Sequence, residues 1–91
     1  MATHGSKQTT DHEEIRKWVQ ARDGRPAAVA QTHSEDDAGI LRIDFGEKEA
    51  NLEEISWEQF FQTFDDRKLA FLYQDKTKDG GTSRFFKFVR R

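Results

Sequence analysis

The stretch SWEQFFQTFDDRKLAFLYQ, residues 56–74, predicts a helix that is followed directly by a strand. Ser56 and Gln59 have the spacing of a capping box, in which each side chain accepts a hydrogen bond from a backbone N–H group of the first turn. The apolar residues then recur at helical spacing and form one hydrophobic stripe: Trp57, Phe60, Phe61 and Phe64. The acidic pair at residues 65–66 is unfavourable at a helix C-terminus, so we expect the helix to end there and residues 69–74 to form a strand.

A second helix is predicted to begin at Thr10, because Thr10 and Glu13 have the same capping-box spacing. Its apolar face consists of residues at positions i, i+3, i+4 and i+7: Ile15, Trp18, Val19 and the aliphatic part of Arg22. Gly24 and the nearby Pro26 are typical of a helix end. Residues 1–9 are small and polar without periodicity, and we expect them to be disordered.

Three further strands are expected, at residues 26–32, 39–45 and 84–89. The stretch 39–45 alternates, with Leu41, Ile43 and Phe45 on one face and more polar residues on the other. Residues 46–55 are predicted to be an acidic loop, and Gly80 and Gly81 lie in a turn between the last two strands.

The predicted order α-β-β-α-β-β within residues 10–91 corresponds to a single α+β domain. We expect a two-layer sandwich, with one four-stranded, mostly antiparallel sheet and both helices on one face. This order equals a ferredoxin-like plait whose first strand has moved to the end of the chain. Residues 40–45 and 84–89 would then be parallel neighbours at the sheet centre. An internal duplication of two α-β-β halves is an alternative origin of the order.

Charge is distributed unevenly along this chain of 91 residues and net charge −2. Residues 34–66 contain eleven acids and two bases, whereas residues 67–91 contain eight bases and two acids. Such asymmetry concerns binding partners more than the fold. The absence of cysteine excludes disulfides and thiolate metal sites, and no apolar run approaches the roughly 20 residues of a membrane span. A cytoplasmic location is the default expectation.

Several segments resemble a family of short, uncharacterised bacterial proteins. They are residues 10–16 (TDHEEIR), 24–29 (GRPAAV), 41–45 (LRIDF), 53–61 (EEISWEQFF), 72–75 (LYQD) and 83–87 (SRFFK). Members of this family often carry the label 1,4-alpha-glucan branching enzyme. That label does not fit, because such an enzyme resembles an amylase with a (β/α)₈ barrel of several hundred residues. The resemblance therefore implies a recurring fold and assigns no catalytic residue.

No motif in the sequence predicts a metal, cofactor or catalytic site. Residues 75–80 resemble the start of a calcium loop, but the twelfth position, which requires an acid, is Phe86. His33 lies among acids on a predicted loop, without the cysteines or the helical histidine pair typical of zinc. Ser56 is explained as a helix cap, and no serine has a Gly-x-Ser-x-Gly context. We therefore expect a protein that is not an enzyme, with a small hydrolase as the least favoured alternative.

The last strand provides the candidate binding face. If Phe86 and Phe88 point towards the helices, then Phe85, Lys87 and Val89 lie on the open face of the sheet. Arg42 would project from the same face of the neighbouring strand. Tyr73 would join them together with Phe71, unless their neighbours Ala70 and Leu72 face that way instead.

This face suggests two functions. The first is a protein-interaction module that binds a protein partner or a second copy of the chain, with Phe85 and Val89 as apolar contacts and Arg42 and Lys87 as charged ones. The second is single-stranded nucleic-acid binding, because aromatic and basic groups on a sheet resemble a stacking platform. The isoelectric point near 5.9 argues against nucleic acid.

Overall fold

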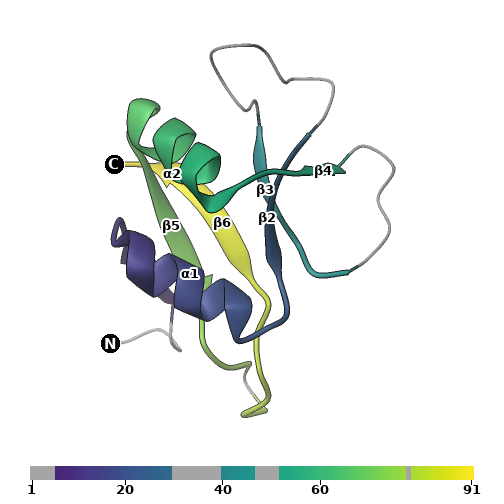
Figure 1. Cartoon of the computed structure of the whole chain (residues 1–91). Coiled ribbons are helices and arrows are strands. Elements are labelled where there is room, and N and C mark those ends of the chain that lie inside the picture. Colours follow the sequence, from purple (N-terminus) through teal and green to yellow (C-terminus); the bar gives the residue numbers. More distant parts are fainter. Residues whose placement is uncertain (1–5, 30–39, 47–51, 78) are drawn as a thin grey trace.

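The computed structural model describes residues 6–29, 40–46, 52–77 and 79–91 of the chain. They form two helices and six strands, an α+β arrangement (Figure 1). In chain order the elements are β1 (Ser6–Thr9), α1 (His12–Gln20), β2 (Arg25–Val29), β3 (Leu41–Asp44), β4 (Leu52–Glu54), α2 (Trp57–Asp66), β5 (Leu69–Gln74) and β6 (Phe86–Arg90).

The strands form two three-stranded antiparallel sheets, not the single four-stranded sheet expected from the sequence. The first sheet has the order β1-β5-β6 and the second the order β3-β2-β4. β3 pairs with β2 and β6 pairs with β5, as expected of consecutive strands, but β3 and β6 are not the parallel neighbours that were also expected. The architecture thus differs from a permuted ferredoxin-like plait. The expected α-β-β-α-β-β order is also wrong, because β1 and β4 are additional strands.

Both additional strands are short and polar. Ser6–Thr9 was expected to be disordered, yet it pairs with β5 from Ser6↔Gln74 to Thr9↔Phe71. Leu52–Glu54 was assigned to an acidic loop, yet it pairs with β2. Each is an edge strand that exposes most of its side chains, so neither has the alternating hydrophobic pattern by which strands are recognised.

Both helices begin with a side-chain cap. α2 begins as predicted, with the Ser56 hydroxyl accepting a hydrogen bond from the Gln59 N–H group at 3.0 Å. The cap of α1 is Asp11 and not Thr10, because the Asp11 carboxylate accepts from the N–H groups of Glu13 and Glu14. A carboxylate at this position also interacts favourably with the positive end of the helix dipole.

The C-terminus of α1 is shaped by Asp23 and Gly24 in different ways. Asp23 adopts the left-handed conformation, with φ of 59°. Gly24 is needed for space instead, because a Cβ atom there would lie 2.9 Å from Val19 Cγ1 and 3.0 Å from Ile43 Cγ2. The glycine therefore allows the end of α1 to approach β3 closely.

The hydrophobic core lies between the helices and the two sheets. Both helices cover the same face of the β1-β5-β6 sheet, as Figure 1 shows. Trp18 of α1 packs edge-on against Phe71 of β5 at 5.4 Å, and Phe60 of α2 contacts Phe88 of β6 at 6.0 Å between ring centroids. Leu41 and Ile43 of β3 are buried, as the alternation predicted. The aromatic stripe of α2 is likewise confirmed, with Phe60, Phe61 and Phe64 buried.

Candidate functional site: the outer face of β6 and a groove between the helices

Three of the five predicted binding residues lie together on β6 or beside it. Phe86 and Phe88 pack against the core, and the alternation places Phe85, Lys87 and Val89 on the opposite face. Phe85 is 46% exposed, which makes it one of two exposed large hydrophobic side chains among the described residues. The predicted orientation of this strand is therefore confirmed.

Tyr73 does not belong to this face. It pairs with Phe86, so both side chains point into the core, and only 3% of Tyr73 is exposed. Its ring lies 5.5 Å from that of Trp18, and its hydroxyl donates a hydrogen bond to the Glu14 carboxylate. Burial, and then the hydrogen bond to the negatively charged Glu14, raise the pKa of Tyr73. The alternative residue of β5, Leu72, pairs with Lys87 and lies on the outer face.

Arg42 is also separated from the predicted face. It belongs to β3 in the second sheet, where it pairs with Ala27 of β2. Its guanidinium donates a hydrogen bond to the Leu41 carbonyl oxygen at 3.1 Å. The predicted juxtaposition of Arg42 with β6 depended on β3 and β6 being hydrogen-bonded neighbours, and they are not.

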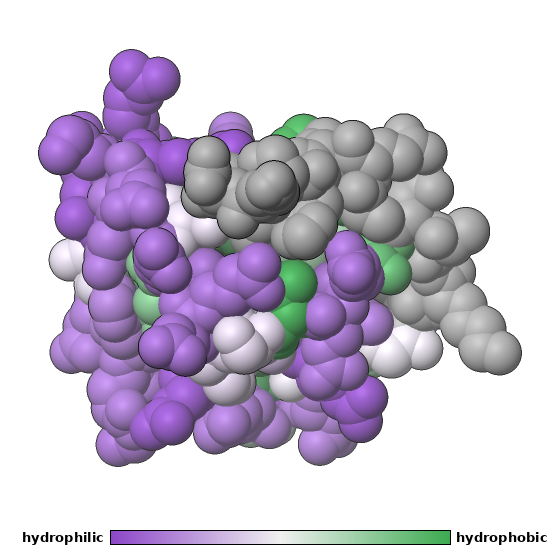
Figure 2. Space-filling view, turned by 45° about the horizontal axis from the view of Figure 1, so that its top comes forward, coloured by the Kyte–Doolittle hydropathy of each residue, from purple (hydrophilic) through white to green (hydrophobic). Residues whose placement is uncertain are grey.

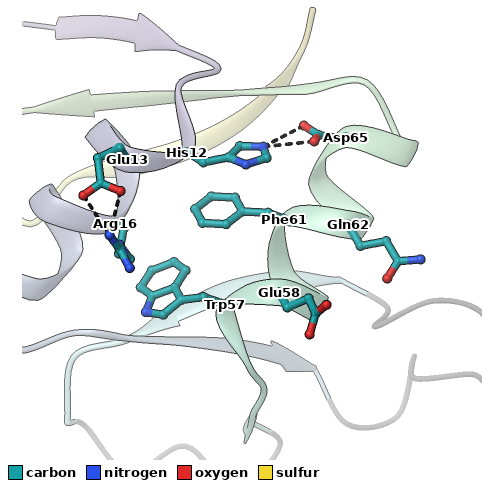
Figure 3. A pocket seen from close by; sticks show the side chains of 8 residues that line it. All are labelled: His12, Glu13, Arg16, Trp57, Glu58, Phe61, Gln62 and Asp65. Carbon is teal, nitrogen blue, oxygen red and sulfur yellow. Dashed lines mark hydrogen bonds and ion pairs between the residues drawn. The ribbon is translucent and has the colours of Figure 1, made fainter.

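A groove of about 450 Å³ lies between α1 and α2 (Figure 3). Its floor contains a row of three aromatic rings. Phe61 stacks on His12, with centroids 4.1 Å apart and planes inclined by 9°, and on its other side Phe61 lies 5.3 Å from Trp57 at 19°. Other lining residues are charged or polar: Glu13, Arg16, Glu58, Gln62 and Asp65.

Ion pairs engage most of the charged groups of the groove. Both carboxylate oxygens of Glu13 accept hydrogen bonds from Arg16, at 2.6 and 2.7 Å. Asp65 lies 2.9 Å from His12 Nε2 and 2.7 Å from a guanidinium nitrogen of Arg91. For Glu58, the structure shows no ion pair with any described residue.

The hydrogen bonds lower the pKa values of two of these acids. Partial burial would raise the pKa of Asp65, but the hydrogen bonds from His12 and Arg91 outweigh it, so the pKa of Asp65 is lowered. The hydrogen bond from Arg16 lowers the pKa of Glu13. Two of the three groove carboxylates are thus held by cations.

The groove was not predicted from the sequence, although part of its signal is visible there. Trp57, Phe61 and Asp65 follow one another at i, i+4 and i+8, which places them on one face of a helix. The sequence does not predict that His12 contacts Phe61, because these two residues are 49 positions apart in the chain.

No group of described residues has the composition of a metal site, and no described helix is long and apolar enough to span a membrane. No protein-family model matches the chain, and no significant match was found among the curated proteins or the solved structures. The resemblance to short bacterial proteins therefore stays a prediction.

Proposed function

We propose that this chain is a non-enzymatic protein-interaction module, and that it binds an acidic, extended segment of a partner protein along β6. The observation that supports this best is that β6 pairs with β5 alone among the described strands. Such an edge strand can accept another strand through its backbone groups.

The hydrogen bonds between β5 and β6 define which backbone groups point to the free edge. Gln74 N–H donates to the Phe85 carbonyl oxygen at 3.3 Å, and Arg91 N–H donates to the Lys68 carbonyl oxygen at 2.9 Å. In an antiparallel ladder alternate residues bond to the same neighbour. The N–H and C=O groups of Phe86, Phe88 and Arg90 therefore point away from β5.

Charge favours an acidic partner. Residues 84–91 contain four bases and no acid, and Lys87 and Arg90 are exposed. Two copies of β6 paired with each other would bring these like charges close together, which is unfavourable. The face of the molecule seen in Figure 2 is mostly hydrophilic, with small, separate hydrophobic patches.

Single-stranded nucleic acid remains the second candidate, because Phe85 and Lys87 lie side by side on the outer face. It is less favoured than a protein partner. Sheet platforms that bind single strands use two or three aromatic side chains. Since Tyr73 is buried, Phe85, which directly precedes β6, is the exposed aromatic residue on this face among the described residues.

Titration of the intact protein with a peptide of alternating glutamate and valine, followed by NMR, tests the proposal. We expect the amide signals of Phe86, Phe88 and Arg90 to shift and to gain protection from hydrogen exchange. A lysine–valine peptide should not bind, and affinity for the glutamate peptide should fall as salt rises. We expect Lys87→Gln to weaken binding by about 2- to 5-fold. The control Lys17→Gln, an exposed position on α1, should leave it unchanged.

Three outcomes would contradict the proposal. If neither peptide binds, strand addition at β6 is excluded. Shifts of Phe85 and Lys87 with a single-stranded oligonucleotide, in the absence of peptide binding, would favour the nucleic-acid function. Sedimentation as a dimer that survives high salt would instead assign Phe85 and Val89 to self-association.

A further inference from the structure

We propose that the groove between α1 and α2 is a second recognition site, which binds a cationic side chain, arginine or lysine, of a partner protein. Trp57 would provide the aromatic surface and Glu58 the countercharge. This inference does not depend on the function proposed for β6, because the groove is built from the helices and the outer face of β6 lies on the other side of the sheet (Figure 1).

The stacked rings of His12, Phe61 and Trp57 give the groove an aromatic surface. Phe61 is sandwiched between His12 and Trp57 and is only 9% exposed. Trp57 ends the row and is partly exposed, and Phe60 supports it edge-on at 5.3 Å. Tryptophan is the ring that attracts cations most strongly, and a guanidinium or ammonium group within about 6 Å of its face gains a favourable interaction.

The charges around the rings favour a cation over an anion. Three carboxylates line the groove: that of Glu13 is paired with Arg16, and that of Asp65 with His12 and Arg91. Glu58, next to Trp57 in the chain, is exposed and has no described ion-pair partner. It lies in the first turn of α2, where the helix dipole favours its negative charge. An anionic ligand would be repelled by this carboxylate, which lines the groove (Figure 3).

The size and shape of the groove suit one long side chain. Its volume of about 450 Å³ lies within the range of sites for small ligands, so the groove can hold the charged end over Trp57 beside Glu58 and the aliphatic part along its remaining length. A purely apolar side chain would leave Glu58 and Gln62 without a polar partner at the contact. We therefore expect charge, and not hydrophobicity alone, to determine what binds.

The test compares two short peptides that differ in charge only, Gly-Gly-Arg-Gly-Gly and its citrulline counterpart, both with blocked ends. Binding to the intact protein is followed through the indole N–H signals in NMR spectra. Trp57 is distinguished from Trp18, whose indole N–H donates to the Gln74 carbonyl oxygen at 3.0 Å. We expect the arginine peptide to shift the Trp57 signal at concentrations up to about 10 mM, above the ~1 mM dissociation constant of a weak contact. The citrulline peptide should not shift it.

Two variants locate the site. Glu58→Gln, an exposed and nearly isosteric change, should weaken binding of the arginine peptide by about 2- to 5-fold. Asp66→Asn, which removes an exposed acid of the same helix outside the groove, should leave the affinity unchanged. The double variant Lys87→Gln, Arg90→Gln should also bind the arginine peptide normally, which separates this site from β6.

Equal shifts with the arginine and citrulline peptides would overturn the proposal in favour of apolar docking. If neither peptide shifts the indole N–H signal of Trp57, the groove is not a binding site for a cationic side chain. A Trp57 signal that moves on dilution of the protein alone would show that a second copy of the chain, and not another protein, occupies the groove.

Discussion

At the scale of single residues, Arg22 is a charged side chain that is largely buried and engaged in hydrogen bonds. Only 8% of its side chain is exposed. Its guanidinium stacks on Trp18 at 4.2 Å and donates hydrogen bonds to the carbonyl oxygens of Ser83, Trp18 and Asp75. Burial lowers the pKa of Arg22, with Asp75 acting in the opposite direction, but an arginine remains charged at neutral pH. The side chain joins α1 to both ends of the connection between β5 and β6.

Arg22→Lys should lower the free energy of unfolding by about 2–4 kcal/mol, because a lysine cannot reach three carbonyl groups in a plane and leaves some of them buried without a donor. Urea unfolding measures the change. The control is Arg16→Lys, which affects an exposed pair with Glu13 and should cost less than about 1 kcal/mol. Equal effects of the two substitutions would contradict a buried role for Arg22.

Lys68 should be replaceable by glycine with a gain in stability. It follows Arg67, the C-cap residue of α2, and adopts the left-handed conformation, with φ of 53°. Glycine is the residue preferred at this position, so Lys68→Gly should raise the free energy of unfolding by about 0.5–1 kcal/mol. Lys17→Gly, in the middle of α1, should lower it by about 1 kcal/mol. A loss of stability in Lys68→Gly would mean that its side chain, and not its backbone, determines the turn.

At the scale of elements, β1 ties the N-terminal part of the chain to the first sheet. It covers one edge of β5, and Lys7 forms an ion pair of 2.9 Å with Asp75. At its end, the Thr9 hydroxyl donates to the Glu14 carboxylate, which also accepts from Tyr73. One carboxylate therefore links β1, α1 and β5.

Removal of residues 1–9 should lower the free energy of unfolding by at least about 2 kcal/mol, because each lost ladder hydrogen bond contributes roughly 0.5–1.5 kcal/mol. Hydrogen exchange of the β5 amides should also become faster. A chain that lacks only residues 1–5 keeps β1 and is the matched control. If the two shortened chains were equally stable, the pairing of β1 with β5 would not contribute to the fold.

At the scale of the whole molecule, Asp65 joins three regions that are distant in sequence. Its carboxylate, near the end of α2, contacts His12 at the start of α1 and Arg91 at the end of the chain. Arg91 is held there by further bonds to the carbonyl oxygens of Lys68 and Leu69. The two helices and the C-terminus are thus tied together at one end of the groove.

The lowered pKa of Asp65 predicts how stability depends on pH. Because the pKa is lower in the folded state than in the unfolded state, the contribution of Asp65 is complete above the unfolded pKa and is lost as the pH falls through the folded pKa. Asp65→Asn should therefore be less stable than the wild type near neutral pH, and the difference should shrink as the pH falls below about 4, the ordinary pKa of an aspartate.

Urea unfolding at a series of pH values measures this dependence, with Asp66→Asn as the matched control. Asp66 adjoins Asp65 but forms no ion pair with a described residue, so its substitution should not reproduce the acid dependence. A difference between wild type and Asp65→Asn that stays constant down to the lowest pH would contradict the lowered pKa.

The sequence by itself determined the elements with strong local signals. The Ser56 cap and the aromatic stripe of α2 were predicted, because capping and helical periodicity depend on residues within a few positions of each other. The strand at Leu69–Gln74 was found at its observed limits. The alternation in β6 separated Phe86 and Phe88 from Phe85, Lys87 and Val89, since successive side chains of a strand point to opposite faces.

Only the tertiary structure decided which strands pair and which surfaces meet. Alternation shows that β3 buries one face, but it does not specify every partner: β3 pairs with β2, and the expected second pairing with β6 is absent. That choice separated Arg42 from the predicted face, and the register of β5 with β6 buried Tyr73. The contact of His12 with Phe61 and Asp65 arises in the same way. Pairing and packing depend on the summed energies of contacts between distant residues, whereas the patterns in a sequence report the local environment of each residue.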